Sequence, residues 1–495
     1  MSPRSRRATA PVGPPARPPA EPLARRLEEI RSLAAGGIPD GRERLIDALG
    51  SAEPALRQAA AWALGALNET RARTLLEAAL VDPSPEVRST VAESLGYLGR
   101  PESREYLERA LRDPVPRVRS QAAWALWSIG DARSVPALVP LLADPEASVR
   151  WSATTAVGHL GTDEQLSLLE PLLADPSDRV RREAILGLGR SRDPEVAAVV
   201  RPHLDDPARR VRVAAAVVLG RLGDREAVPM LVERLSTDES WVRPALLVAL
   251  GRIGDPAAVP ALVRESRHTA SWVRVCAIHA LGLLRAEAGR EVAIEGLRDR
   301  AWSVRGASAE CLGHVGGPGD LGALLECLQD PHPWPRRGAL YSLGRLGLAE
   351  AAPRIREELQ HPEPEVRLAA IWALGRLRDD GATEAIAGML RASRPTAPVG
   401  DPMAQGDGAV RLLSDAEGRL FDTALQALGR IAPSEVDPTI VRAVSEARQR
   451  VDEVEIDRLA RLPAAEPVDP RYGPTLRTLF EAALPGLGEE DELGC

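Results

Sequence analysis

Apolar positions along this chain recur with helical spacing. In residues 131–161, Leu138 and Leu142 lie four positions apart, and Pro136 precedes them. Apolar residues at this spacing share one face of a helix, and proline is tolerated in a first turn because the N–H groups there have no intrahelical partner. The pattern predicts a first helix that ends before the Asp-Pro pair at 144–145.

A second apolar stripe follows in the same unit. Its members are spaced by four, four and three residues: Val149, Ala153, Val157 and Leu160. The stripe stops at a glycine, which commonly follows the last turn of a helix. We therefore expect a second helix that begins near residue 148 and ends at residue 161.

This two-helix pattern returns every 31 residues. One arginine marks the start of each second helix: Arg57, Arg88, Arg119, Arg150, Arg181, Arg212, Arg243, Arg274, Arg305, Arg336 and Arg367. A glycine follows each arginine by eight residues, except at Trp127, and where a further glycine comes three residues later we interpret the pair as marking the helix end. Such a period is typical of stacked units that cannot bury an apolar face alone. It predicts an all-α fold, a right-handed α-solenoid of eleven regular 31-residue two-helix repeats with irregular caps.

Composition sets the expected boundaries of the array. We expect a disordered Pro/Arg-rich tail (1–22), N-terminal cap helices (23–50), the repeat array (51–391), an irregular insertion (392–418), C-terminal cap helices (419–463) and a tail with an acidic finish (464–495). The first segment cannot bury enough apolar surface to fold.

Charge and motif content narrow the function. The formal net charge is −8, and all 63 basic residues are arginine. A negative chain is not typical of a general nucleic-acid binder. The missing lysine fits either codon bias or avoidance of lysine-directed modification. We identify no catalytic motif and expect no cofactor and no metal.

The cysteines and the apolar runs bear on localisation. Cys276, Cys311, Cys327 and Cys495 show no CxxC spacing, so we expect reduced thiols in a cytoplasmic protein. The Pro-rich N-terminus lacks the apolar core of a signal peptide. No run of about 18 apolar residues occurs, so we expect no membrane span.

The phrase D-P-x-x-x-V-R-x-x-A-x-x-A-L-G-x-L-G resembles the HEAT repeat superfamily, and its short form is similar to the HEAT-like repeats of phycobilin lyases. The resemblance implies that the arginine helix lines a concave side. It also implies that an aspartate six residues before the arginine pairs with that arginine or with its neighbour. This aspartate occurs at Asp82, Asp113, Asp144, Asp175, Asp206, Asp299 and Asp330 and is missing before Arg57, Arg243, Arg274 and Arg367.

We assign these two columns a structural role, because a guanidinium beside a turn aspartate can satisfy turn carbonyls and bridge repeats. The assignment is made for Arg88, Arg119, Arg150, Arg181, Arg212, Asp82, Asp113, Asp144, Asp175 and Asp206.

Residues that vary between repeats are better binding candidates. The positions five and nine after each arginine, here called the paired columns, lie four apart and therefore share a helix face. With Trp127 and Trp151 added, the candidates for a concave binding surface are Trp62, Trp124, Trp127, Trp151, Arg190, Arg221, Arg252, His279, Glu310, His314, Tyr341, Arg345, Trp372 and Arg376. Aromatic residues and arginine are enriched at binding hot spots. The alternative is that the arginines favour helix C-termini and the tryptophans cover neighbouring alanines.

Two smaller features remain. Four tryptophans precede their arginines in consecutive turns and suggest an exposed aromatic edge or mutual packing: Trp241, Trp272, Trp302 and Trp334. We weighed His279, Glu310 and His314 as metal ligands. The di-iron hydroxylase of the superfamily uses His-Glu steps, and this chain has no His-Glu dipeptide. A polar concave patch is therefore the preferred interpretation.

The function expected is that of a protein-binding scaffold, adaptor or regulatory subunit. The partner would be a protein or peptide, acidic with apolar anchors, because rigid guanidinium forks recognise carboxylates and aromatic faces bury apolar side chains. Nucleic acid is not expected. The resemblance leaves one alternative, an enzyme-like relative that uses the same groove as a tetrapyrrole lyase or a DNA base-excision enzyme.

Overall fold

The computed structural model describes residues 23–34, 40–239, 242–392, 423 and 427. Within these residues every regular element is a helix and no strand occurs. The predicted all-α solenoid is confirmed. The chain divides between Asp193 and Pro194 into two compact units. No helix in the described part is long and apolar enough to cross a membrane.

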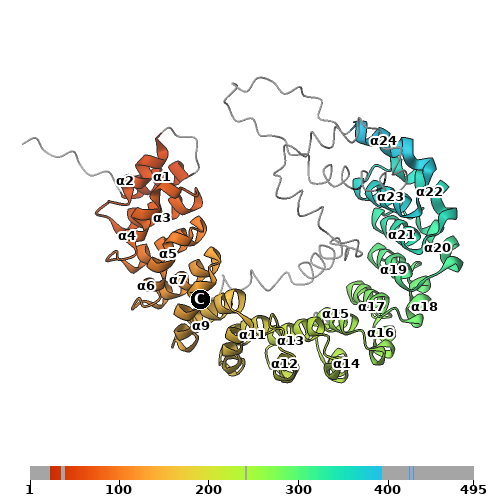
Figure 1. Cartoon of the computed structure of the whole chain (residues 1–495), viewed down its shortest axis with the longest axis horizontal. Helices are drawn as coiled ribbons and strands as arrows, with labels where there is room; N and C mark the ends of the chain where they lie inside the picture. The colour runs from red at the N-terminus through yellow and green to blue at the C-terminus, as the bar shows by residue number, and fades with distance from the viewer. Residues whose placement is uncertain (1–22, 35–39, 240–241, 393–422, 424–426, 428–495) are drawn as a thin grey trace, which may run out of the picture. The chain divides into compact units, whose positions relative to one another are not determined.

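In the first unit, the helices that carry the repeated arginine form one layer, here called the arginine helices (Figure 1). They are α3 (Pro54–Ala66), α5 (Pro85–Leu98), α7 (Pro116–Ile129), α9 (Ala147–Leu160) and α11 (Asp178–Leu188). The other layer contains shorter helices: α2 (Gly41–Ala48), α4 (Arg73–Ala79), α6 (Arg104–Ala110), α8 (Val135–Leu138) and α10 (Asp163–Leu166). Helix α1 (Leu23–Ala34) packs against α2 and α3.

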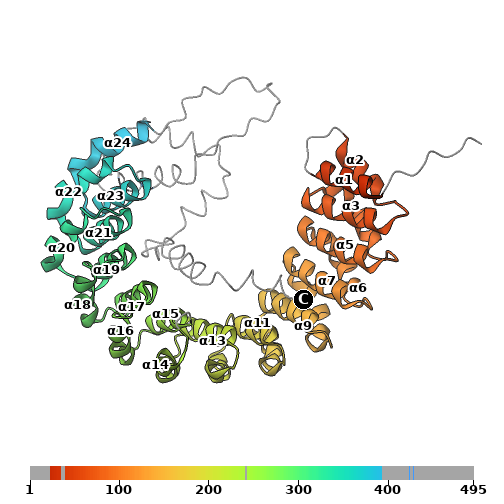
Figure 2. The same cartoon turned by 180° about the vertical axis from the view of Figure 1, so that it is seen from behind.

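The second unit repeats this arrangement. Its arginine helices lie on the inner side of the curve that the unit follows, and Figure 2 shows the same two layers from behind. The arginine helices are α13 (Arg209–Leu222), α15 (Arg243–Ile253), α17 (Ser271–Leu283), α19 (Trp302–Val315), α21 (Pro333–Leu346) and α23 (Pro364–Leu377). The first helices are α12 (Val196–Val200), α14 (Val228–Thr237), α16 (Val259–Glu265), α18 (Glu287–Gly296), α20 (Leu321–Cys327), α22 (Ala352–Glu357) and α24 (Thr383–Ala392).

Three consecutive first helices differ from the expected single helix. In each, a short α-helix passes into a 3-10 segment: Val139–Ala143, Ser167–Ala174 and Arg201–Asp205. Pro140, Pro171 and Pro202 stand 31 residues apart in these segments. Proline has no N–H to donate and its ring clashes with the preceding turn, so the α-helical hydrogen-bond pattern cannot continue.

The two glycines of a pair have different structural roles. This corrects the interpretation that the pair as a whole marks the helix end. The second glycine of a pair is the cap where its φ is positive, as at Gly254 (φ 71°). The first lies inside the helix, against the next arginine helix. A Cβ added at Gly251 would lie 2.9 Å from the Cα of Ala280. This column therefore permits close packing of neighbouring arginine helices.

Several expected segments lie outside the described residues. These are the tail 1–22, all but the first residue of the insertion 392–418, the C-terminal cap helices 419–463 except residues 423 and 427, and the tail 464–495. Trp241 also lies outside them. Helices α1 and α2 occupy the segment expected to form the N-terminal cap.

Candidate functional site

The repeated arginines join consecutive repeats. Arg119 donates from Nε and Nη2 to both carboxylate oxygens of Asp144, each at 2.8 Å. Its Nη1 donates to the carbonyl of Asp113, six residues earlier, at 2.8 Å. Equivalent paired contacts link four further pairs: Arg57–Asp82, Arg88–Asp113, Arg150–Asp175 and Arg305–Asp330. Each aspartate thus pairs with the arginine of the preceding repeat, while its own arginine binds its carbonyl.

The aspartate has a second role in its turn. Its side chain accepts the N–H two residues later, as from Ser84 to Asp82 at 2.8 Å. The hydrogen bond from Arg57 is the main reason why the pKa of Asp82 lies below its usual value. The repeated arginines and their carboxylate partners are here called the ladder. These contacts occupy the guanidinium donors of the described ladder arginines and leave them little capacity to bind a ligand. Arg181 binds the carbonyls of Asp175 and Pro176 in the same way.

Where histidine replaces the aspartate, the two roles are divided. His268 and His361 accept the turn N–H through Nδ1, at 3.0 and 3.1 Å. The arginine of the preceding repeat instead pairs with a glutamate three residues before the histidine. These pairs are Arg243–Glu265 and Arg336–Glu358, at 2.9 and 3.2 Å. Neither glutamate was predicted from the sequence, although both lie three residues before a histidine in the aspartate column.

The ladder has a further variation in the second unit. Arg212 pairs with Asp238, 26 residues later, at 2.6 Å. Arg274 pairs with Asp299 at 2.8 Å although its own turn lacks the aspartate. The missing aspartate before Arg57 and Arg274 therefore leaves neither arginine without a carboxylate, because the partner comes from the next turn.

In the first unit, the paired columns present aromatic rings on consecutive arginine helices. Tyr97 on α5 meets Trp124 on α7 edge-on, with ring centroids 5.2 Å apart. Trp124 lies 6.3 Å from Trp127, whose ring is 5.4 Å from that of His159 on α9. Tyr97 is 53% exposed. The structure therefore forms one chain of rings across three helices, and Tyr97 and His159 are members that the candidate set did not include.

Two other candidates in this unit remain strongly exposed. Trp62 on α3 is 50% exposed and Trp151 on α9 is 38% exposed. The only carboxylate of the paired columns in this unit, Glu93, accepts the Tyr97 hydroxyl at 3.3 Å. Large apolar side chains at this exposure on a single helix layer form a surface suited to a protein partner.

In the second unit, the same columns are rich in arginine. Arg221 on α13 and Arg252 on α15 are exposed. On α21 and α23 the rings of Tyr341 and Trp372 meet at 5.2 Å, and the Arg376 guanidinium lies 5.8 Å from the centre of the Trp372 ring. The third arginine of the predicted series, Arg190, belongs to the first unit, where it is also exposed.

Two histidines of the paired columns, His279 and His314, have lowered pKa values. Burial, with a contribution from Arg252, lowers the pKa of His279 to about 4. Burial and the nearby Arg345 lower the pKa of His314 to about 4 as well. Arg345 lies within 3.0 Å of both ring nitrogens of His314. Among the described residues, no group of three or more His, Cys, Asp or Glu side chains is placed to hold a metal ion.

The turn-edge tryptophans are partly brought together. Trp302, 44% exposed, stacks on His332 with centroids 3.9 Å apart and an interplanar angle of 8°. Trp334 lies 5.2 Å from Trp302, and its indole N–H donates to Glu310 at 3.1 Å. Arg337 lies 5.8 Å from the Trp334 ring. Trp272 is half-buried.

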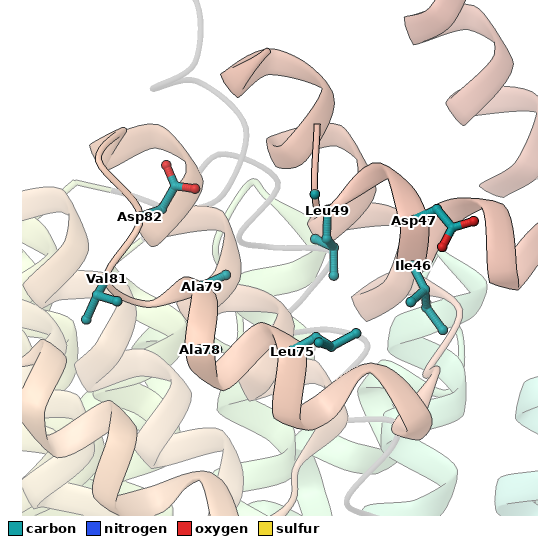
Figure 3. Close-up of a pocket in the computed structure, with 9 residues that line it drawn as sticks. Ile46, Asp47, Leu49, Leu75, Ala78, Ala79, Val81 and Asp82 are labelled. Atoms are coloured by element: carbon teal, nitrogen blue, oxygen red, sulfur yellow. The ribbon is translucent and has the colours of Figure 1, made fainter. Parts of the chain in front are cut away.

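A surface pocket in the other layer was not foreseen from the sequence. It has a volume of about 550 Å³ and lies between α2 and α4 (Figure 3). Ile46, Leu49 and Leu75 line it together with Asp47, and Leu75 is 47% exposed. The expectation of a degenerate cap at 23–50 gave no indication of a hollow at this position.

The described cysteines do not offer a reactive nucleophile. Cys276, Cys311 and Cys327 are buried and form no disulfide with one another. Burial raises the pKa of each thiol to about 12. They therefore stay protonated at neutral pH, and the thiolate is the reactive form of cysteine.

Comparison with known proteins places the chain in a family. No curated protein sequence matches it. Among solved structures, yeast importin-β (Kap95p) is 13% identical, with 92% of this chain and 71% of that chain covered and a TM-score of 0.54. The karyopherin Kap121p, bound to the extreme C-terminus of the protein phosphatase Cdc14p, is 12% identical, with coverages of 84% and 55% and a TM-score of 0.52.

The CpcE–CpcF complex of phycocyanin lyase from Nostoc sp. PCC7120 is 23% identical, with coverages of 57% and 96% and a TM-score of 0.27. At these identities the likeness concerns the fold alone. The profile of the HEAT repeats matches residues 22–84, 72–156, 135–217, 201–274, 264–341 and 322–397. Because these consecutive matches span well over half of the sequence, the chain belongs to the HEAT repeat family.

Proposed function

We propose that this chain is a protein-binding scaffold that takes up an extended, acidic peptide segment along its arginine helices. The observation that carries the proposal is the chain of rings from Tyr97 through Trp124 and Trp127 to His159, with Trp62 and Trp151 exposed on the same layer. Aromatic side chains of this kind anchor protein partners because they bury a large apolar area.

Charge in the paired columns favours an acidic ligand. Five arginines occupy them, Arg190, Arg221, Arg252, Arg345 and Arg376, against two carboxylates, Glu93 and Glu310. Both carboxylates already accept hydrogen bonds from neighbouring side chains. The whole chain is nevertheless negative, at −8. The excess of positive charge lies in the columns of the second unit, where four arginines stand against one carboxylate, and such a charge distribution selects partners of the opposite sign.

Helix spacing limits the form of the ligand. Packed helices lie about 10 Å apart, and an extended chain advances about 3.3 Å per residue. An extended peptide that crosses the arginine helices therefore meets a new helix at about every third residue. The Kap121p complex provides one example of this fold bound to the terminus of another protein. No observation favours the lyase or base-excision alternative.

Peptide display against the full chain tests this proposal. We expect enriched sequences to carry acidic and large apolar residues with a spacing near three. The charge-reversed variant Arg221→Glu/Arg252→Glu should lose binding at least tenfold. The matched control is Arg225→Glu/Arg298→Glu, which changes the same charge at two exposed arginines outside the paired columns. Equal loss in both variants, or enrichment of basic peptides, would contradict the proposal.

A single-stranded oligonucleotide serves as the competing ligand. Phosphate binding weakens steeply with salt because counterions are released, whereas peptide binding depends on salt less. Tight oligonucleotide binding with the steeper salt dependence, combined with no enriched peptide, would assign the surface to nucleic acid.

A further inference from the structure

This chain itself contains a segment with the chemistry of the proposed ligand. Residues 478–495 carry five carboxylates and no basic residue. Four of these carboxylates form the run 489–492, which is the only run of more than two consecutive acidic residues in the sequence. The apolar residues of the segment are Leu479, Phe480, Leu484, Leu487 and Leu493, besides two alanines. It is thus acidic and rich in large apolar side chains.

The surface that complements this segment best lies on α21 and α23. Arg345 and Arg376 occupy the same column one repeat apart. Tyr341 and Trp372, from the other paired column of the same helices, lie beside them with their rings 5.2 Å apart. Two guanidinium groups and two rings are therefore presented together, and neither helix contributes a carboxylate to the paired columns.

The spacing and the local field agree with this pairing. Four residues in extended form span about 13 Å, enough to bridge two helices packed about 10 Å apart. The region is also electropositive, since Arg345 and Arg285 help burial to lower the pKa of His314. A run of four carboxylates would then contact both Arg345 and Arg376.

The described end of the array lies beside this surface. A Cβ added at Gly375 on α23 would lie 2.8 Å from the Cα of Ala427, so the chain passes α23 at that point. Residue 489 follows 62 residues later (489 minus 427). That length spans up to about 200 Å when extended, so chain length does not prevent a return to α21 and α23.

We propose that residues 478–495 bind intramolecularly to the paired-column surface of α21 and α23, with the carboxylates 489–492 on Arg345 and Arg376. This inference rests on the proposed function. A tethered ligand competes at an effective concentration in the millimolar range for short flexible linkers and lower for longer ones. The segment therefore lowers the apparent affinity of the second unit for an external acidic peptide, and displacing it exposes the surface.

The first test removes the negative charge from the segment in the full chain. The variant Glu489→Gln/Glu490→Gln/Asp491→Asn/Glu492→Gln is titrated with a fluorescent synthetic peptide of residues 478–495. We expect at least tenfold tighter binding than to the unaltered chain, because the site is no longer occupied. Adding Arg345→Gln/Arg376→Gln should abolish this binding, whereas adding Arg221→Gln/Arg252→Gln in the same columns should preserve it. Far-UV circular dichroism verifies folding of every variant.

The outcomes separate this inference from the proposed function. No binding of the 478–495 peptide to the charge-neutralised chain, with display-selected peptides still bound, would overturn the tail inference and leave the scaffold proposal intact. Display-selected peptides that do not depend on the paired columns would instead overturn the scaffold proposal.

Cross-linking gives an independent positional readout. The described cysteines are buried with pKa values of about 12, so a maleimide reagent at neutral pH is directed to Cys495. A photoreactive group attached there should cross-link to fragments that contain α21 or α23 of the same molecule. Cross-links confined to other fragments, or formed only between two chains, would overturn the intramolecular assignment.

Discussion

A ladder arginine contacts two repeats at once, and its aspartate partner also acts in two ways. Asp330 accepts Nε and Nη2 of Arg305 at 2.6 and 2.9 Å and the N–H of His332 at 2.9 Å. One short side chain therefore closes its own turn and holds the preceding repeat. At His361 only the turn contact is retained, and Glu358 provides the carboxylate that Arg336 needs. The two functions of the aspartate are physically separable.

This division makes a rescue experiment possible. Glu358→Ala removes the carboxylate beside Arg336 and should lower the free energy of unfolding by about 1–3 kcal/mol, the cost of a polar partner left unsatisfied in a half-buried site. Adding His361→Asp restores the residue found in other repeats and should recover at least half of that loss. Urea denaturation of the full chain measures both effects. His361→Asp that fails to rescue Glu358→Ala would show that the two positions are not equivalent sources of charge.

At the scale of the helix, small residues set the spacing between neighbours. Gly251 on α15 faces Ala280 on α17, where an added Cβ would lie 2.9 Å from a backbone Cα that cannot move alone. Gly388 on α24 has no neighbour among the described residues within 4 Å of its added Cβ. The same residue type therefore serves close packing at one site and costs helix stability at the other.

Two matched substitutions test this contrast. Gly251→Ala should destabilise the array, since its clash exceeds the roughly 0.5–1 kcal/mol that alanine gains in helix propensity. Gly388→Ala gains the same propensity without a clash and should leave the chain equally stable or stabilise it. Thermal unfolding followed by circular dichroism compares the two. A Gly251→Ala variant at least as stable as the original would mean that neighbouring arginine helices separate easily.

The sequence period was sufficient to predict the helices, because each 31-residue unit meets the same neighbours. It was insufficient to predict departures from the repeat, which depend on single residues and on their contacts in the neighbouring repeat. Pro140 lies between Leu138 and Leu142, within the predicted first helix, but it forces a 3-10 segment. Stacking of Trp302 on His332 joins adjacent turns through a histidine that no aromatic pattern marked. The pairing of Glu265 was not predicted, because its partner Arg243 belongs to the preceding repeat.

At the scale of the whole molecule, the paired columns differ in charge from the rest of the chain. The chain carries −8 overall, yet the paired columns hold five arginines and two glutamates. In the second unit, burial and, to a smaller extent, nearby cationic groups lower the pKa values of His279 and His314 from 6.5 to about 4. At neutral pH both imidazole rings are therefore uncharged and add no positive charge beside the arginines of the same columns.

Stability should therefore depend on pH in a defined window. Between about pH 6.5 and 4 the unfolded chain protonates both histidines while the folded chain does not, so the unfolded state binds more protons and stability falls as pH falls. Below pH 4 this contribution levels off, and the ladder aspartates, whose pKa values are lowered by their arginines, begin to lose their stabilising charge. The urea midpoint should decrease from pH 7 to pH 5.

The double variant His279→Gln/His314→Gln isolates the cause. We expect it to flatten the decrease between pH 7 and pH 5, because the unfolded chain then has two fewer groups to protonate in that range. His159→Gln, at an exposed site of the same columns in the first unit, should leave the decrease almost unchanged. An equally steep decrease in the double variant would place the responsible groups elsewhere and remove the histidines as the link between the cationic face and stability.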